Sequence, residues 1–153
     1  MADTMTVSFS KGLGAPVGSM VLCAADRAAE ARRIRKMLGG GMRQIGLLAA
    51  AADYAVRHHL PLLEDDHRRA RKLAEAAAGC SGLSVDPATV ETNIVIFDVE
   101  GESAGEAVAR LEERGVKMVP FGPQTLRATF HFQVDDEGLG RACEVLGELF
   151  NRP

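Results

Sequence analysis

Lys11 is the side chain in this sequence best suited to covalent chemistry. It follows a short apolar segment, Thr6–Phe9, and is followed at once by Gly12 and Gly14. A lysine amine is a nucleophile only when unprotonated, which requires burial or a cationic neighbour to lower its pKa. Glycines let the backbone approach a bulky ligand and leave room for the lysine to fold back. The residues alone leave a simpler alternative open, in which Lys11 extends from a strand end into a loop.

Two further groups of basic residues could bind anions. The first lies between residues 32 and 43, and its members are Arg32, Arg33, Arg35, Lys36 and Arg43. The same spacing is also typical of a solvated helix face, which is the interpretation we favour for Arg32 and Arg33. The second is Arg127, whose planar guanidinium could hold a carboxylate through two hydrogen bonds.

Other polar residues have simpler explanations than a site. His58, His59 and His67 could suggest a metal, but His59 and His67 are about two helical turns apart across Pro61. No third ligand is placed to join them, so we expect solvated helix-end histidines and no metal. Asp65–Asp66 lies near a helix start, where carboxylates favour the macrodipole.

Composition excludes several classes of function. The formal net charge of -3 and the 25% content of charged residues give no reason to expect nucleic acid or an anionic membrane as partner. The longest apolar stretch, Ile45–Ala52, is too short to span a bilayer. The first residues do not resemble a signal peptide. Cys23, Cys80 and Cys143 form neither a disulfide framework nor a zinc pattern, which favours a reducing cytoplasm.

The first half of the chain predicts two strands followed by helices. The strands are Thr6–Phe9 and Ser19–Ala24, and the second is apolar enough to be buried on both faces. A helix is expected over Arg27–Leu38, with Asp26 as its N-cap and Gly39–Gly41 as its end. Two more helices should follow, at Met42–His59 and Pro61–Ala78. The inward stripe of the first of these comprises Ile45, Leu48, Ala49, Ala52 and Val56.

From Val85 onward the pattern changes to that of a compact α/β lobe. The expected order is strand, helix, strand, strand, helix, at Asn93–Phe97, Ala104–Arg114, Gly115–Val119, Thr125–Val134 and Glu137–Phe150. We place the boundary between the two parts of the chain at residues 82 and 83, within a turn-rich segment.

Two longer runs carry a resemblance to a known family. The first is Phe9–Ser19, with the sequence FSKGLGAPVGS, and the second is Arg35–Gln44, RKMLGGGMRQ. Together they resemble the threonine aldolases, PLP-dependent lyases (PLP is pyridoxal phosphate) that are grouped with the β-eliminating lyases. The likeness extends from about Thr4 to Phe150. It implies an α/β fold: residues 1–82 as the C-terminal portion of a fold-type I PLP-binding large domain, and residues 83–153 as a small α/β C-terminal domain.

The resemblance also implies roles for four residues. Lys11 would hold PLP as a Schiff base, with the cofactor as electron sink. Lys36 and Arg43 match basic residues that reach the PLP phosphate from a neighbouring subunit, which implies a homo-oligomer. Arg127 matches the arginine that clamps the substrate α-carboxylate. His131 also matches the motif, but support of the lobe is at least as good an interpretation as catalysis.

The sequence departs from the family in two respects. The family strand has the pattern Arg-x-Val-Thr-His, whereas this chain has Arg127-Ala128-Thr129-Phe130-His131, so Phe130 replaces a small polar residue. In addition, the aspartate that pairs with the pyridine nitrogen, the histidine stacked on the ring and a further arginine lie upstream in the family. No position of this sequence matches them, because the likeness covers less than half of a usual subunit.

The function we predict is that of the C-terminal part of a threonine aldolase-type lyase, which cleaves a β-hydroxy-α-amino acid such as threonine into glycine and an aldehyde. The alternative is a non-catalytic remnant or interaction module that pairs with itself or with a separate N-terminal half. A different lyase or transaminase of the same fold type fits less well, because the Arg35–Gln44 run is more particular to the aldolases.

Overall fold

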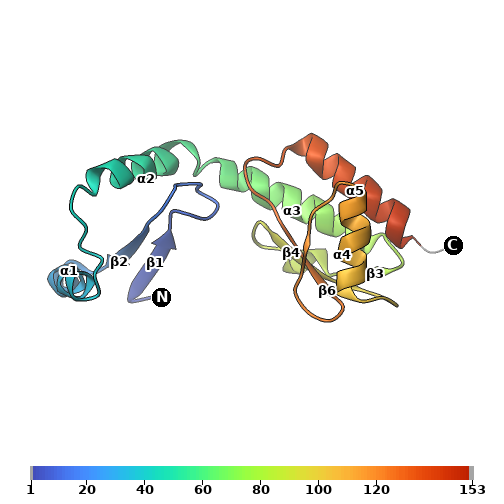
Figure 1. Cartoon of the computed structure of the whole chain (residues 1–153), viewed down its shortest axis with the longest axis horizontal. Helices are drawn as coiled ribbons and strands as arrows, with labels where there is room; N and C mark the ends of the chain where they lie inside the picture. The colour runs from blue at the N-terminus through green and yellow to red at the C-terminus, as the bar shows by residue number, and fades with distance from the viewer. Residues whose placement is uncertain (1, 152–153) are drawn as a thin grey trace. The chain divides into compact units, whose positions relative to one another are not determined.

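The computed structural model describes residues 2–151 (Figure 1). The chain divides into one unit that ends at Pro61 and another that begins at Leu62. The first unit comprises β1 (Thr4–Ser8), β2 (Ser19–Cys23), the short 3-10 helix η1 (Ala25–Arg27), α1 (Ala28–Met37) and α2 (Gly46–His58).

Strands β1 and β2 form an antiparallel hairpin, with Ser8 opposite Ser19 and Thr4 opposite Cys23. No third strand among residues 2–151 pairs with either of them. The apolar side chains of β2 are therefore uncovered, and Val21 at its centre is 54% exposed. The prediction that this strand is buried on both faces is wrong for the described chain, because a strand needs layers on both sides of its sheet to be buried there.

The glycine triplet ends α1 as predicted. Gly39 has φ of +82°, a left-handed conformation that suits glycine. The Gly40 N–H donates to the Arg35 carbonyl at 2.9 Å, and the Gly39 N–H donates to the Lys36 carbonyl at 3.2 Å. These two bonds form a Schellman motif, which satisfies carbonyls that the last helical turn leaves open.

The expected starts of α1 and α2 need correction. Asp26 lies inside η1 rather than capping α1, whose N-cap is Arg27 without a side-chain hydrogen bond. Helix α2 begins at Gly46, four residues later than expected, after Gln44 with its φ of +52°. Its buried residues are Ala52 and Ala55. Of the expected stripe, Ile45, Ala49 and Val56 are exposed and Leu48 is half-buried.

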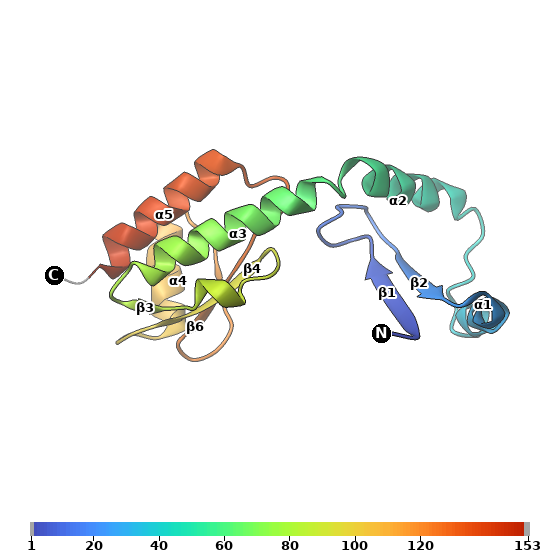
Figure 2. The same cartoon turned by 180° about the vertical axis from the view of Figure 1, so that it is seen from behind.

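The second unit is a two-layer α/β lobe (Figure 2). Its elements are α3 (Leu62–Ala78), β3 (Leu83–Ser84), the 3-10 helix η2 (Pro87–Thr89), β4 (Ile94–Val99), α4 (Ala104–Glu113), β5 (Val119–Pro120), β6 (Thr125–Thr129) and α5 (Asp136–Phe150). The sheet is antiparallel in the order β3-β4-β6-β5. Helix α3 packs against β4 and α5, and α4 packs against β5, β6 and α5.

Alternation along the strands explains why one face of this sheet forms the core. In β4, Val95, Phe97 and Val99 are buried while the intervening residues are exposed, as the two-residue period of a strand requires. The predicted helices over 104–114 and 137–150 are confirmed by α4 and α5. The helical spacing of Leu139, Ala142, Val145, Leu146 and Leu149 predicts an inward stripe, of which Leu139, Val145 and Leu146 are buried and Ala142 and Leu149 are half-buried.

Two expectations for the second unit differ from the structure. Strand β5 starts at Val119 rather than extending over 115–119, and β6 ends at Thr129 rather than at Val134. The chain turns at 131–134, where the Val134 N–H donates to the His131 carbonyl at 2.8 Å. Helix α3 packs with the second unit. None of the helices in the described part of the chain has the length and apolar character needed to cross a membrane.

Candidate active site

Lys11 lies in the loop of residues 9–18 that joins β1 to β2. The Phe9 N–H donates to the Gly18 carbonyl at 2.9 Å and continues the hairpin ladder beyond Ser8. The Gly14 N–H donates to the Lys11 carbonyl at 2.8 Å and closes a four-residue turn. Gly14, with its φ of +67°, meets the conformational demand of this turn. Lys11 is exposed, so its amine projects from a turn whose backbone is fixed by hydrogen bonds.

The same loop is fastened to the rest of the first unit at Leu13 and Ala15. Leu13 is 6% and Ala15 is 7% exposed, and together with Ala52 and Ala55 of α2 they are the buried apolar residues between positions 2 and 61. His59, just after α2, places Nδ1 2.7 Å from the Leu13 carbonyl oxygen. The expectation that His59 is a solvated helix-end histidine is therefore wrong. His58 does fit that description, since it is exposed beside the Tyr54 ring.

The side chain of Lys36 packs against the backbone of the glycine triplet. A Cβ atom on Gly41 would lie 2.8 Å from Lys36 Cδ and 3.7 Å from its Nζ. The lysine side chain therefore extends along a backbone that only glycine leaves open. No described carboxylate pairs with Lys36 or with Arg43, which is exposed in the loop after the triplet. Arg33 behaves as the expected surface residue, with a 3.8 Å ion pair to Glu30.

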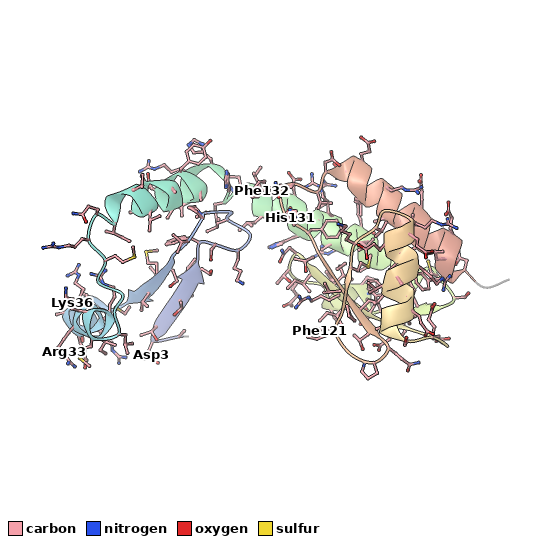
Figure 3. The ribbon with its side chains drawn as sticks, in the orientation of Figure 1. Asp3, Arg33, Lys36, Phe121, His131 and Phe132 are labelled. Carbon is pink, nitrogen blue, oxygen red and sulfur yellow. The ribbon has the colours of Figure 1, made fainter. Side chains whose placement is uncertain are left out.

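Lys11 and Lys36 belong to opposite ends of the hairpin. The 9–18 loop joins the strands at one end, whereas α1 follows β2 at the other, where Lys36 is labelled in Figure 3. The structure thus places Lys11, Lys36 and Arg43 in one unit, but it does not bring the lysine amine and the two basic residues together within that unit.

Arg127 lies on β6, between Ile96 of β4 and Val119 of β5. It alternates with the buried residues Leu126 and Ala128, so it belongs to the face of the sheet opposite the helices. Its Nε is buried and has no hydrogen-bond partner among the described residues. An unsatisfied buried donor is costly.

Phe121, which the sequence did not single out, lies beside this arginine. The Arg127 guanidinium carbon lies 5.4 Å from the centre of the Phe121 ring, within the range of a cation–π contact. The Phe121 N–H donates to the Thr125 carbonyl at 2.8 Å, so the turn between β5 and β6 fixes the Phe121 backbone. Figure 3 labels Phe121 on the second unit. The register between β5 and β6 brings Phe121 next to Arg127. That register could not be derived from the residue types.

Asp66 and His131 also differ from expectation. Asp66 is fully buried, its two carboxylate oxygens accept no hydrogen bond from the described residues, and Arg69 Nη1 lies 3.7 Å away. Burial raises the pKa of the Asp66 carboxyl, and the nearby charges of Arg69, His131 and His67 oppose that shift. His131 is exposed in the turn beyond β6, so it is not a strand histidine. Phe130, in contrast, is buried in the core.

A metal site does not emerge from the residues at positions 2–151. No three histidine, cysteine, aspartate or glutamate side chains gather there as a metal ion would require.

Comparison with known proteins places this arrangement in a family. Residues 1–100 match the family model of the β-eliminating lyases. The chain belongs to the β-eliminating lyase family. Enzymes of this family, and their fold-type I neighbours, depend on PLP. The resemblance expected from the two sequence runs is thus confirmed.

Curated relatives of this β-eliminating lyase chain include proteins named as threonine aldolases. It is 44% identical to a probable low-specificity L-threonine aldolase of Arabidopsis thaliana, a match that covers 98% of this chain and 43% of that protein. It is 36% identical to the low specificity L-threonine aldolase of Escherichia coli K12, a match that covers 92% of this chain and 41% of that protein. The chain spans less than half the length of these relatives.

Solved structures confirm the expected fold class. The serine palmitoyltransferase of Sphingomonas wittichii matches 96% of this chain with a TM-score of 0.74 at 18% identity, and the match covers 39% of that protein. The cysteine desulfurase of Thermococcus onnurineus matches 97% of this chain with a TM-score of 0.72 at 19% identity, covering 47% of its own chain. The chain therefore has the fold of the C-terminal portion of fold-type I PLP enzymes.

Proposed function

We propose that this chain is the C-terminal part of a PLP-dependent lyase of the threonine aldolase type, which cleaves a β-hydroxy-α-amino acid such as threonine to glycine and an aldehyde. The observation that carries the proposal is the position of Lys11, an exposed amine on a turn fixed by hydrogen bonds, within the segment that matches the β-eliminating lyases. The 44% identity to a plant relative named for this activity supports it.

The residues present fit PLP. Lys11 offers a primary amine for the cofactor aldehyde, and the absence of side chains at Gly12 and Gly14 leaves space for a bulky ligand next to it. Lys36 and Arg43 offer cationic donors for a dianionic phosphate, and no described carboxylate neutralises them. When bound, PLP supplies an electron sink for the pair released as the Cα–Cβ bond breaks.

Arg127 would bind the substrate carboxylate. Its unsatisfied Nε and its position on the face of the sheet away from the helices suit a two-point hydrogen bond to an anion. With the carboxylate held, the substrate keeps one orientation while the Cα–Cβ bond breaks. The β-hydroxyl loses its proton as the aldehyde forms, and Cα gains a proton to give glycine. Lys11 Nζ would be the amine that holds PLP.

A second copy of the chain would complete the phosphate site. Because α1 and the 9–18 loop belong to opposite ends of the hairpin, Lys36 and Arg43 are better placed to serve the Lys11 of a neighbour than their own. The proposed partners are thus a small amino acid and a further subunit, together with the N-terminal half that the relatives contain. Residues 1–82 would belong to the large domain and residues 83–153 to the small one. Three free thiols suit a cytoplasmic setting.

A non-catalytic interaction module is the second candidate. It is favoured by the uncovered apolar strand β2, where Met20, Val21 and Leu22 are all exposed. It is also favoured by the absence of any position that matches the ring-binding residues of the family. An enzyme whose preceding half covers β2 and supplies the ring-binding residues would show the same exposed strand and the same unmatched positions.

One experiment separates the two candidates. The chain would be mixed with the preceding half of the Arabidopsis relative, loaded with PLP, reduced with borohydride and digested for mass spectrometry. The enzyme proposal expects the loaded protein to release glycine from threonine before reduction. It expects PLP on the Lys11 peptide after reduction, and the loss of both results in Lys11→Ala. Lys117→Ala, a change at a lysine of the second unit, is the matched control. Absence of PLP from Lys11 in the reconstituted protein would reject the catalytic role.

A further inference from the structure

The peptide group between Leu13 and Gly14 is held on both of its sides. Its N–H donates to the Lys11 carbonyl at 2.8 Å, and its C=O lies 2.7 Å from His59 Nδ1. A carbonyl oxygen can only accept, so His59 Nδ1 must carry the proton of this bond. Two hydrogen bonds in series thus connect the imidazole of His59 to the backbone of Lys11.

His59 itself is held firmly enough to act as an anchor. Its own N–H donates to the Ala55 carbonyl at 2.8 Å, so its backbone continues the last turn of α2. Its ring is half-buried and meets the Tyr54 ring edge-on, with 5.6 Å between the ring centres. Ala55 and Ala52 are buried about one and two turns earlier in the same helix. The imidazole is therefore fixed by a helix that is itself packed.

His58, the adjacent residue, also contacts the Tyr54 ring but has no hydrogen bond to the described residues of the 9–18 loop. It is exposed, and its ring lies 4.2 Å from that of Tyr54. The two histidines follow each other on the helix, so only one of them can point toward the loop. This pair provides a matched control within the same helix turn.

We propose that His59 is a positioning residue for Lys11: its Nδ1–H fixes the Leu13–Gly14 peptide and thereby the turn from which the lysine amine projects. The effect on cofactor capture rests on the function proposed above for Lys11, whereas the effect on the turn does not. A mobile turn would carry the lysine amine away from a reactive geometry, and a turn fixed by hydrogen bonds removes that part of the loss. No part of this role requires His59 to touch the substrate.

The wild-type chain of 153 residues provides the first measurement. Nitrogen-15 chemical shifts of the imidazole distinguish a protonated Nδ1 from a bare one. The proposal expects a protonated His59 Nδ1 with a coupling across the hydrogen bond to the Leu13 carbonyl. A bare Nδ1 on His59 would overturn it without any need for a variant to fold.

Amide hydrogen exchange of Gly14 provides the second measurement. We expect His59→Ala to raise its exchange rate by about fivefold to tenfold, because one hydrogen bond that orders the peptide is lost. His59→Asn should restore most of the protection, since its side-chain N–H can occupy the place of Nδ1–H, and His58→Ala should leave the rate unchanged. Equal exchange in wild type and His59→Ala, or equal loss in His58→Ala, would overturn the proposal.

Cofactor capture gives the third measurement and separates the two proposals. In the reconstituted protein, PLP capture by Lys11 before borohydride reduction should slow severalfold in His59→Ala and recover in His59→Asn, while capture by Lys117 stays constant. If Lys11 captures no PLP even in wild type but the first two measurements succeed, the proposed function fails and the turn anchor stands. If wild type and His59→Ala capture PLP at the same rate, the positioning role is wrong and the proposed function stands.

Discussion

The guanidinium of Arg127 lies over the ring of Phe121, with 5.4 Å between the guanidinium carbon and the ring centre, within the range of a cation–π contact. The two residues come from opposite arms of the β5–β6 hairpin, whose register pairs Val119 with Arg127. Phe121 is 59% exposed, so the pair stands at the surface of the lobe. The ring limits the motion of the arginine that we assign to the substrate carboxylate.

Phe121→Leu should weaken substrate binding without affecting the chemistry. Loss of the cation–π contact at an exposed site predicts a KM about two- to fivefold higher, with kcat nearly unchanged. Steady-state kinetics of the reconstituted enzyme would check this. Phe121→Tyr keeps the aromatic face and is expected to match wild type. A fall in kcat with a constant KM would contradict a role in holding Arg127.

Mixed oligomers can reveal whether the phosphate donors serve a neighbouring copy. Lys11→Ala and Lys36→Ala should each be inactive, but coexpressed as a twofold dimer they should regain about a quarter of wild-type activity. Half of the dimers would be mixed, and one of the two sites in each would be intact. Arg33→Ala, which alters a surface ion pair of the same helix, should remain active. Inactive mixtures would show that Lys36 serves its own subunit.

The second unit could be predicted from the sequence because it contains its own core. Leu139, Val145 and Leu146 recur at helical spacing and are buried on the sheet of the same lobe. The strand Ile94–Val99 alternates for the same reason. In the first unit, the apolar residues of β2 predict a strand buried on both faces. No described element covers this strand, so its apolar side chains are exposed.

The site residues show a similar division. Lys11, Lys36, Arg43 and Arg127 could be proposed because whole runs around them match a family. His59 contacts a backbone carbonyl, and Phe121 reaches Arg127 through the register of a hairpin. Neither contact can be predicted from the types of these residues or from their spacing. Asp65 and Asp66 look alike in sequence, but Asp65 is exposed and pairs with Arg68 at 3.3 Å, whereas Asp66 is buried.

Gly41→Ala tests the fit between Lys36 and the glycine triplet. The added Cβ would lie 2.8 Å from Lys36 Cδ, so the flexible side chain must leave its position while the backbone stays in place. We expect the affinity of the reconstituted enzyme for PLP to fall about three- to tenfold, because the displaced Lys36 amine makes a weaker charge-assisted contact to the phosphate, which Lys36→Ala removes altogether. Titration followed by absorbance would measure it.

Gly46→Ala is the control for that change. Gly46 is the first residue of α2, and no atom lies within 4 Å of a Cβ placed there. Alanine favours the helix over glycine, so the chain should become slightly more stable and its affinity for PLP should not change. An equal loss of affinity in both variants would show that the loss at Gly41 is not specific to Lys36.

Asp66 should make the stability of the chain depend on pH. Because burial raises the pKa of its carboxyl, the folded state binds this proton more tightly than the unfolded state does. The stabilisation is therefore complete below the unfolded pKa, near 3.8, and is lost as the pH rises through the higher folded pKa. Asp66→Asn removes the charge, and Arg69 keeps its 3.0 Å contact to Asp136.

We expect Asp66→Asn to be about 1 kcal/mol more stable than wild type at pH 7, with an advantage that shrinks toward pH 4. Free energies of unfolding from urea titrations across this pH range would measure the difference. Asp65→Asn alters an exposed carboxylate and should show no such trend. A constant difference between Asp66→Asn and wild type from pH 4 to pH 7 would mean that Arg69 neutralises the cost of burying the carboxylate.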